Sequence, residues 1–473
     1  MKLPGTYAAY AVILALLGQT PAGVHCGVIL VNAATIVLVY FLTARLFGPI
    51  AGVAACASYG LLSSRPAMLG LAGHATHFVV LPAMGGILLL LRAIDNKRNW
   101  LFFSSGALMG LAFLMKQPGI LFSLFGVFYL LVAGRKSKTA WGVLWWRVAY
   151  FSLGAALPFV LTCLILFKAG VFHNFWFWTF SYASKYGTSI PISGGVRLFW
   201  FYFPRDVVGA TIFIWLIAAA GFAALFWNAN ARPRACFAAG FLLFSFLAVC
   251  PGLHFRPHYF IVMLPAVSLL AGVAVASAMD LYPRNRVLRL GSVLVFAAAW
   301  SYPIVRQAYF FFEEDPTAAC LSIHSGSSPF AAVLGIADYL KNHATKSSQI
   351  AVLGSEPEIY FYSHLHSATN YIYTYGLSEE QPYALQMQKE MISEIEAVRP
   401  EYLIYVGNPS SWGIEPDTRP PIFLWAHKYL EDYYELTGIA DVFPQTEYRW
   451  GEDAKAYRPR SPDTIQVFKR KEP

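Results

Sequence analysis

Long apolar runs separated by short polar segments fill the first three hundred residues of this 473-residue chain. A transmembrane helix needs roughly 20 mostly apolar residues, so each run near that length predicts a membrane crossing. We expect ten crossings, at residues 24–44, 50–64, 78–92, 100–115, 118–133, 148–168, 206–227, 236–250, 259–279 and 290–306. Tyr7–Leu17 is apolar but shorter, which predicts a helix lying at the outer membrane surface.

The pattern changes after residue 306, where helical and strand periodicities alternate as in a water-soluble domain. We expect a membrane domain at residues 1–306 and a separate domain at residues 307–473. The expected strands are Gln349–Leu353, Tyr371–Tyr375, Tyr402–Val406 and Thr464–Phe468, and the expected helices are Pro329–Asn342, Gln381–Val398 and Pro421–Leu436. This alternation predicts a small α/β domain with a largely parallel sheet. The loops Gly354–Glu356 and Gly407–Trp412 would lie at its ligand-binding edge.

Basic residues follow every odd-numbered crossing. They are Arg45, Arg92, Lys97, Arg98, Arg135, Lys136, Lys138, Arg147, Arg232, Arg234, Arg284, Arg286 and Arg289. Loops rich in Lys and Arg stay on the cytoplasmic side, so this distribution predicts the orientation of all ten crossings. Residues 65–77, the loop 169–205 and the whole C-terminal domain are then extracytoplasmic.

Composition agrees with a membrane protein, because 57% of the residues are hydrophobic and only 13% are charged. A soluble protein carries about 25% charged residues. The net charge of +9 comes largely from the short basic loops, so it does not indicate a nucleic-acid partner. The six cysteines form no Cys-x-x-Cys pair, and no disulfide framework or zinc motif is readable.

The segment Leu69–Phe78 interrupts two apolar runs and carries His74 and His77, which would share one face of a helix. Imidazoles at the edge of a bilayer need partners, and polar groups at membrane depth are candidates for function. Two interpretations remain open. The histidines either form hydrogen bonds within a helix cap, or they bind a divalent metal or a lipid phosphate.

Three further cations are expected on the outer face, namely Lys2, Lys116 and Arg256. Each either binds the phosphate of a lipid carrier or anchors the chain at the headgroups. His258 and Tyr259 follow Arg256 and are candidates for binding substrate or metal. Glu356 is the acid of the C-terminal domain that we single out, although an acid at a helix start is often only structural.

The loop 169–205 is dense in Trp, Phe and Tyr. Trp and Tyr prefer the headgroup level, so the loop is either an interfacial belt or a wall for an isoprenoid chain or a sugar.

The order of several motifs resembles the glycosyltransferase family 39 type of membrane enzyme, which includes protein O-mannosyltransferases. These motifs are Lys2-Leu3-Pro4-Gly5, then Thr43–Gly48, then Gly110–Gly119 and finally His258–Ala266. The resemblance covers about residues 1–270. It implies a GT-C fold and an enzyme that takes a sugar from a polyprenyl-phosphate carrier.

The resemblance also implies roles for single residues. Lys2 takes the place of a lysine that faces the lipid phosphate, and Lys116 matches a second family lysine. An acidic residue often found in the second outer loop is replaced near Thr76 and His77. The family's catalytic aspartate would lie upstream of Met1, so we expect an N-terminally incomplete chain and leave the catalytic base unassigned.

We therefore predict a transferase that moves a hexose or pentose from a polyprenyl-phosphate carrier to a glycan, lipid or protein acceptor. The predicted location is the inner (plasma) membrane of a bacterial-type cell, with the transfer and the C-terminal domain on the extracytoplasmic face. A divalent metal held by His74 and His77 is a candidate cofactor. The alternatives are a catalytically inactive subunit that binds lipid-linked sugar and a transporter or flippase of such lipids. A flippase would show internal repeats and charged residues deep within crossings, and neither is visible.

Overall fold

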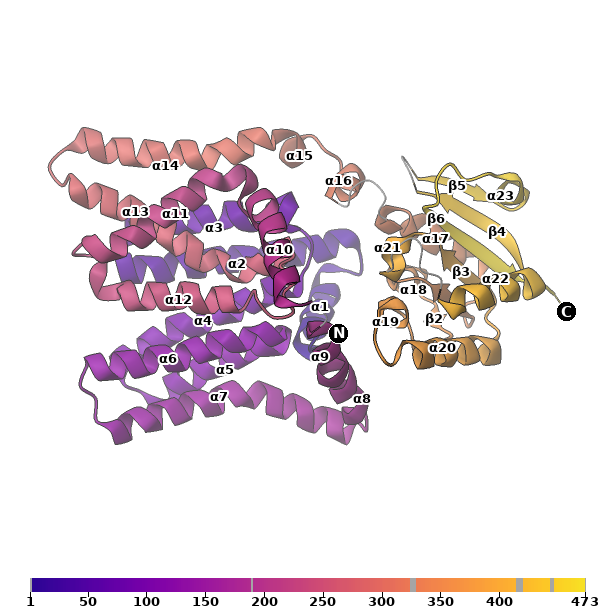
Figure 1. The fold of residues 1–473 in the computed structure, drawn as a ribbon, viewed down its shortest axis with the longest axis horizontal. Coiled ribbons are helices and arrows are strands. Elements are labelled where there is room, and N and C mark those ends of the chain that lie inside the picture. Colours follow the sequence, from indigo (N-terminus) through magenta and orange to yellow (C-terminus); the bar gives the residue numbers. More distant parts are fainter. Residues whose placement is uncertain (1, 189, 324–328, 414–419, 443–445, 473) are drawn as a thin grey trace. The chain divides into compact units, whose positions relative to one another are not determined.

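The computed structural model describes residues 2–188, 190–323, 329–413, 420–442 and 446–472. The chain divides into two compact units, Met1–Phe311 and Phe312–Pro473. The first is built from helices and the second contains one sheet with helices on both of its faces (Figure 1).

The first unit is a bundle of long helices joined by short turns and by 3-10 and π-helical segments. Its elements are α1 (Pro4–Leu17), α2 (Pro21–Phe47), α3 (Pro49–Ser63), η1 (Pro66–Met68), α4 (Ala75–Asn96), α5 (Asn99–Met115), η2 (Gln117–Gly119), α6 (Ile120–Lys136), α7 (Trp141–Lys168), α8 (Phe172–Trp176), η3 (Phe177–Ser181), α9 (Tyr182–Gly187), α10 (Ile192–Tyr202), η4 (Phe203–Val208), η5 (Gly209–Thr211), α11 (Ile212–Trp227), η6 (Arg232–Arg234), α12 (Ala235–Leu247), η7 (Pro257–Val262), α13 (Leu264–Leu281), α14 (Arg286–Arg306) and α15 (Ala308–Phe312).

Each of the ten stretches predicted to cross the membrane overlaps an α-helix, although residues 206–211 and 259–262 lie in π- or 3-10-helical segments. In the described part of the chain, seven helical segments are long and apolar enough to span a bilayer. They are Pro21–Phe47, Ala75–Asn96, Gln117–Lys136, Trp141–Lys168, Ile192–Trp227, Leu264–Leu281 and Arg286–Arg306. The helices α1, α3 and α5 are apolar but shorter. The prediction of a polytopic helical membrane protein with a small C-terminal sheet domain is confirmed.

Helices α5 and α7 pack closely through glycine. A Cβ atom at Gly106 would lie 2.0 Å from the carbonyl oxygen of Phe151, and one at Gly110 would lie 2.1 Å from that of Ala155. The spacing Gly-x-x-x-Gly places both glycines on one helix face, where small residues let two membrane helices approach. This contact fixes the position of the α5 C-terminus, which precedes Lys116.

The second unit contains a six-stranded sheet in the order β2-β1-β3-β6-β4-β5. Its elements are α16 (Pro316–Ile323), η8 (Pro329–Ala331), α17 (Val333–His343), β1 (Gln349–Leu353), α18 (Glu358–Ser363), β2 (His366–Ser367), α19 (Tyr375–Ser378), α20 (Ala384–Val398), β3 (Tyr402–Val406), α21 (Pro409–Trp412), α22 (Pro421–Tyr433), β4 (Tyr434–Asp441), β5 (Glu447–Trp450), α23 (Glu452–Ala456) and β6 (Thr464–Arg470).

The expectation of a largely parallel sheet is wrong for half of the strands. Strand β1 pairs in parallel with β2 and β3, as the βαβ pattern predicts. Strands β4, β5 and β6 are antiparallel to their neighbours. The pattern missed β4 because its sequence follows α22 without a Gly or Pro break. Helix α22 ends at Tyr433, whereas the predicted helix ran on to Leu436. Pairing of β4 with β6 overrides the local helical preference here.

The predicted strand at Tyr371–Tyr375 is also wrong, since α19 begins at Tyr375 and β2 lies earlier, at His366–Ser367. The segment before α19 is held as a loop by a carboxylate of helix α20. Thr369 Oγ1 donates to Glu394 at 2.6 Å, and the backbone N–H of Asn370 donates to the same carboxylate at 3.0 Å. These side-chain bonds satisfy the backbone that a strand would otherwise use.

Candidate functional site

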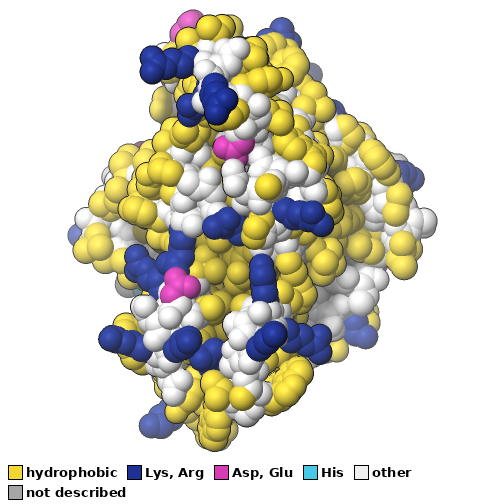
Figure 2. All heavy atoms as spheres, turned by 90° about the vertical axis from the view of Figure 1, so that its left-hand side faces the viewer, with side chains coloured by type: hydrophobic (Ala, Val, Ile, Leu, Met, Phe, Trp, Pro, Cys, Tyr) yellow, Lys and Arg dark blue, Asp and Glu magenta, His cyan; other side chains and the backbone are white. Residues whose placement is uncertain are grey.

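The basic loops of the first unit gather at one end of the bundle. Figure 2 looks onto this end and shows many Lys and Arg side chains with few acidic ones. Arg45 at the end of α2 forms an ion pair with Asp95 at the end of α4. Lys136 Nζ donates to the carbonyl of Pro233, 3.1 Å away, which joins two further loops. The charge pattern of the sequence therefore corresponds to one physical face, as positive-inside loops require.

Lys2 and Lys116 are brought to one end of the bundle by the packing of α1 on α5. Thr6 Oγ1 donates to the carbonyl oxygen of Met115 at 2.6 Å. A Cβ atom at Gly5 would lie 2.6 Å from the carbonyl oxygen of Leu114, so only glycine allows this approach. The N-terminal turn of α1 is thereby fixed beside the residue that precedes Lys116.

Lys116 lies over an aromatic ring. Its ammonium is 3.9 Å from the ring centre of Tyr259, within range of a cation–π interaction. Next to it, the imidazoles of His74 and His258 stack with their centres 4.0 Å apart and an interplanar angle of 11°. The rings of His258 and Tyr259 are 4.7 Å apart and nearly perpendicular. Residues 74, 116 and 258–259, from three separate loops, thus form one cluster.

The charged groups of this cluster shift the pKa values of their neighbours. Burial, followed by the nearby charges of Lys2 and Arg256, lowers the pKa of Lys116 to about 7. Burial also lowers the pKa of His258, and His74 and the three cations lower it further, so His258 is neutral near pH 7. Lys2 and Arg256 are exposed, while Lys116 and His258 are half-buried. The arrangement is a cluster of basic groups that an anion would stabilise.

His77 does not join this cluster. His74 precedes the first turn of α4 in extended conformation, whereas His77 lies within the helix and is only 1% exposed. The structure therefore pairs His74 with His258 rather than with His77. Among the residues the structure describes, no group of three or more His, Cys, Asp or Glu side chains could hold a metal ion. The donor set does not fit the metal that His74 and His77 were expected to bind.

The sequence pattern did not single out one acidic residue, Asp206. Residues 1–311 contain three carboxylates, Asp95, Asp206 and Asp280. Asp95 pairs with Arg45, and Asp280 accepts a hydrogen bond from Asn230 at 2.9 Å in the loop beside η6, so both lie at the basic end. Asp206 lies in η4 instead. Sorting the acids by predicted membrane side would have singled it out.

Asp206 belongs to the end of the bundle that carries the cationic cluster. Segment η4 packs against η1 and against η7, which contains His258. The rings of Phe203 in η4 and Phe260 in η7 are 5.5 Å apart. Asp206 itself accepts two hydrogen bonds from Arg205, at 2.9 and 2.8 Å.

A buried arginine fixes this segment. Arg65 is 1% exposed, and its Nη1 donates to the carbonyl of Val207 at 2.6 Å and to Thr211 Oγ1 at 3.1 Å. Asp206 is the carboxylate whose charge acts on Arg65. A buried guanidinium needs such compensation, so Arg65 holds the π-helical turn in place.

In the second unit, Glu356 lies where the loops after β1 and β3 meet. The sequence placed both loops at this edge, and the contacts confirm it. Ser411 Oγ donates to the Glu356 carboxylate at 2.7 Å and accepts the backbone N–H of Ser355 at 2.9 Å. Glu356 is 2% exposed. Burial raises its pKa to about 8, the bond from Ser411 lowers it, and the nearby Glu358 charge raises it.

This burial predicts how the second unit responds to pH. An unfolded glutamate ionises near pH 4.5, while Glu356 in the folded unit holds its proton to about pH 8. The stability that Glu356 contributes is therefore fully present below pH 4.5 and is lost as the pH rises to about 8. In Glu356→Gln this loss with rising pH is expected to be shallower. Hydrogen exchange of the β1 and β3 amides in the intact protein measures the stability of the second unit at each pH.

Glu452→Gln is the matched control, because the Glu452 side chain is 87% exposed. It should leave the pH dependence of exchange unchanged. An equally steep pH dependence in Glu356→Gln would contradict the assignment of a protonated buried carboxyl.

Comparison with known proteins agrees with this architecture. Residues 2–165 match the family model for dolichyl-phosphate-mannose-protein mannosyltransferases. No curated protein matches the chain. Among solved structures, ArnT from Cupriavidus metallidurans in the apo state has a TM-score of 0.56 at 17% identity, and the match covers 99% of this chain and 87% of ArnT. This likeness confirms the GT-C fold expected from the sequence.

Two structures of an Archaeoglobus fulgidus oligosaccharyltransferase are more distant. The form tethered with an acceptor peptide has a TM-score of 0.49 at 10% identity and covers 95% of this chain. The form in complex with an inhibitory peptide and a dolichol-phosphate has a TM-score of 0.48 at 13% identity and covers 99% of this chain. This chain spans 66% of the length of the first and 68% of the second.

Proposed function

We propose that this chain, a multi-pass membrane protein of the GT-C glycosyltransferase fold, transfers a sugar from a polyprenyl-phosphate carrier to an acceptor. One observation carries the proposal. Lys2, Lys116 and Arg256 come together at one end of the helical unit, opposite to the end that carries the basic loops. That arrangement suits a carrier phosphate on the extracytoplasmic face.

The three cations would stabilise the phosphate that leaves when the sugar is transferred. Breaking the bond between the sugar and the phosphate leaves extra negative charge on the phosphate oxygen. Lys116 is half-buried, where a charge interacts more strongly than in bulk water. Arg256 offers a two-pronged donor for phosphate oxygens. The cationic cluster is thus complementary to the negatively charged carrier phosphate that sugar transfer releases.

The acceptor hydroxyl must lose a proton as it attacks. Asp206 is the carboxylate of Met1–Phe311 that lies away from the basic end, and η4 holds it beside η7. We assign it the role of the base, with Arg205 holding its carboxylate in place by two hydrogen bonds. His258, neutral near pH 7, would orient the acceptor or the sugar by hydrogen bonding.

The aromatic loop offers a place for the isoprenoid chain. Gln117, next to Lys116, donates from Nε2 to the carbonyl of Thr179 at 3.3 Å, which ties the loop to the cationic cluster. Trp176 is 44% exposed, and its ring is 4.6 Å from that of Phe180. An apolar chain that starts at the cluster would run along these rings.

We place the protein in a plasma membrane of bacterial type, with the cationic cluster and the C-terminal unit on the extracytoplasmic side. The support is the basic end of Figure 2, which the positive-inside rule assigns to the cytoplasm. The acceptor is then a glycan, a lipid or a protein of the cell envelope.

The test is discharge of the carrier. Purified protein in nanodiscs is incubated with a panel of undecaprenyl-phosphate hexoses and pentoses plus an envelope extract as acceptor. Mass spectrometry measures released undecaprenyl phosphate. We expect one donor to be discharged, and Lys2→Ala and Arg256→Ala to slow this by about tenfold or more. Full activity in both variants would overturn the assignment of the cationic site, and no discharge of any donor would contradict the function.

A further inference from the structure

The second unit contains a pocket that the proposed transfer does not use. It has a volume of ≈ 290 Å³ and lies between helix α22 and one face of the sheet. It is lined by Tyr405, His427, Leu430, Glu431, Tyr434, Gln466 and Phe468. We propose that this pocket binds one neutral monosaccharide unit.

The strands that line the pocket differ on their two faces. Ile404, Val406, Ile465 and Val467 point to one side and are fully buried in the core. On the other side, Tyr405 of β3 is paired in register with Gln466 of β6. Tyr405, Gln466 and Phe468 remain partly exposed although α22 packs over this sheet face. Two aliphatic side chains at positions 405 and 466 would fill the space between the sheet and α22. The polar and aromatic side chains found there leave that space open.

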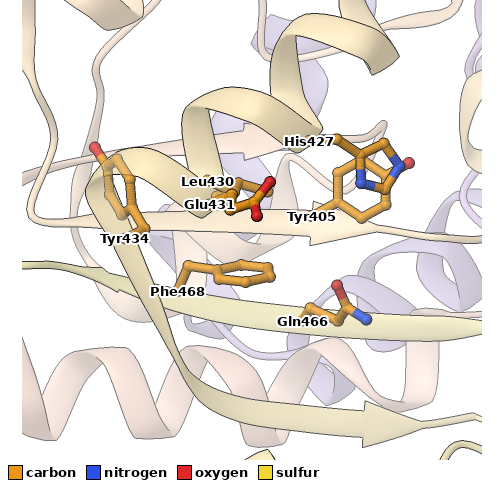
Figure 3. A pocket seen from close by; sticks show the side chains of 7 residues that line it. All are labelled: Tyr405, His427, Leu430, Glu431, Tyr434, Gln466 and Phe468. Carbon is orange, nitrogen blue, oxygen red and sulfur yellow. The ribbon is translucent and has the colours of Figure 1, made fainter.

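Helix α22 supplies polar groups to the opposite wall. His427 and Glu431 are four residues apart and share a helix face, while Ala426 and Leu430 are buried and fix the helix on the sheet. Figure 3 shows His427 beside Tyr405 at one end of the pocket and Tyr434 toward the other, with Glu431 between them in this view. The ring centres of Tyr405 and His427 are 5.9 Å apart.

These groups match the two kinds of surface on a sugar. The C–H faces of a pyranose pack against aromatic rings, here those of Tyr405 and Phe468. The hydroxyls need acceptors and donors, which Glu431, Gln466 and His427 supply. The volume is close to the lower limit of about 300 Å³ for small-molecule sites, which suits a single ring.

The electrostatics exclude an anionic ligand. None of the described residues lining the pocket is Lys or Arg. Glu431 lies in the last turn of α22, where the helix dipole presents its negative end. Lys471 is nearby, but its ammonium binds the carbonyls of Glu431 and Asp432 at 2.6 and 3.3 Å. A hydroxyl-rich ligand fits this environment, and a phosphate or nucleotide does not.

The pocket takes no part in the proposed sugar transfer. An experiment can therefore find glycoside binding without sugar transfer, or sugar transfer without glycoside binding. If the proposed function also holds, this pocket would hold a sugar of the acceptor glycan. The pocket would then add affinity for glycan acceptors over protein or lipid acceptors by tethering them to the enzyme.

The experiment uses the intact protein in nanodiscs and a panel of methyl glycosides of glucose, galactose, mannose and N-acetylglucosamine. Saturation-transfer NMR titrations measure binding. We expect saturable binding of at least one glycoside, weakened about tenfold or more in Glu431→Gln and in Gln466→Ala. Asp432→Asn, an exposed neighbour outside the pocket, should bind like the wild type.

Circular dichroism of each variant excludes unfolding as the cause of a loss. Absence of binding for every glycoside would overturn the proposal, as would binding that Glu431→Gln and Gln466→Ala leave unchanged. Binding that persists while no lipid-linked donor is discharged would support the pocket and refute the transferase.

Discussion

Replacing Lys116 by alanine is expected to slow sugar transfer by about 10²–10³-fold, the usual effect of removing one charged stabiliser of a leaving group. Lys116 follows the C-terminus of α5, and its ammonium is fixed 3.9 Å above the ring of Tyr259. Its amino group is therefore held in position before the carrier binds. The rate of release of undecaprenyl phosphate from its sugar-linked form measures the effect.

Lys97→Ala is the matched control, because Lys97 is an exposed lysine at the basic end of the bundle. It should transfer sugar at the wild-type rate. A drop of similar size in Lys97→Ala would mean that net charge, and not the position of Lys116, sets the rate.

Lys116 also predicts a pH dependence. With a pKa of about 7, its side chain is protonated below pH 7 and loses its charge as the pH rises above 7. Binding a phosphate above pH 7 must then be coupled to proton uptake, which lowers the apparent affinity. In Lys116→Arg the guanidinium stays charged, so the fall in affinity between pH 7 and 9 should be shallower.

Asp206→Asn is expected to reduce transfer by about 10²–10⁴-fold, the range for loss of a general base, while carrier binding is retained. The amide keeps the size of the carboxylate but cannot accept a proton. The readout that separates catalysis from structure is a lowered maximal rate with an unchanged affinity for undecaprenyl phosphate.

Asp280→Asn removes a carboxylate of the same unit at its basic end, where Asp280 binds Asn230. This variant should remain active. If Asp206→Asn transfers sugar normally, the base lies elsewhere in the protein. If it loses carrier binding as well, Asp206 serves the fold through Arg65.

Much of the membrane unit could be predicted because a bilayer imposes a simple pattern. Apolar runs and basic loops located the helices of the membrane unit and its basic end, although seven described segments, rather than the ten expected, are long and apolar enough to span a bilayer. The outer cluster was harder, because Lys116, His74 and His258 meet only through the packing of separate helices. The sequence suggested a pair of His74 and His77 from their spacing, whereas the fold pairs His74 with His258.

The second unit shows a different limit. The parallel strands β1 and β3 were predicted at their exact bounds, because buried apolar runs flanked by turn residues are distinctive. Strands β4 and β5 depend on pairing with β6 and with each other, which local propensity does not reveal. The pocket beside α22 could not be foreseen, since it exists only where that helix packs over the sheet.

Titration of intact protein in nanodiscs with undecaprenyl phosphate, followed by thermal stabilisation, is the most direct test of the carrier-phosphate site. We predict saturable stabilisation that is lost in Lys116→Ala and retained in Lys97→Ala. Stabilisation that is absent, or that is equal in the wild type and Lys116→Ala, would contradict a carrier-phosphate site at this end of the bundle.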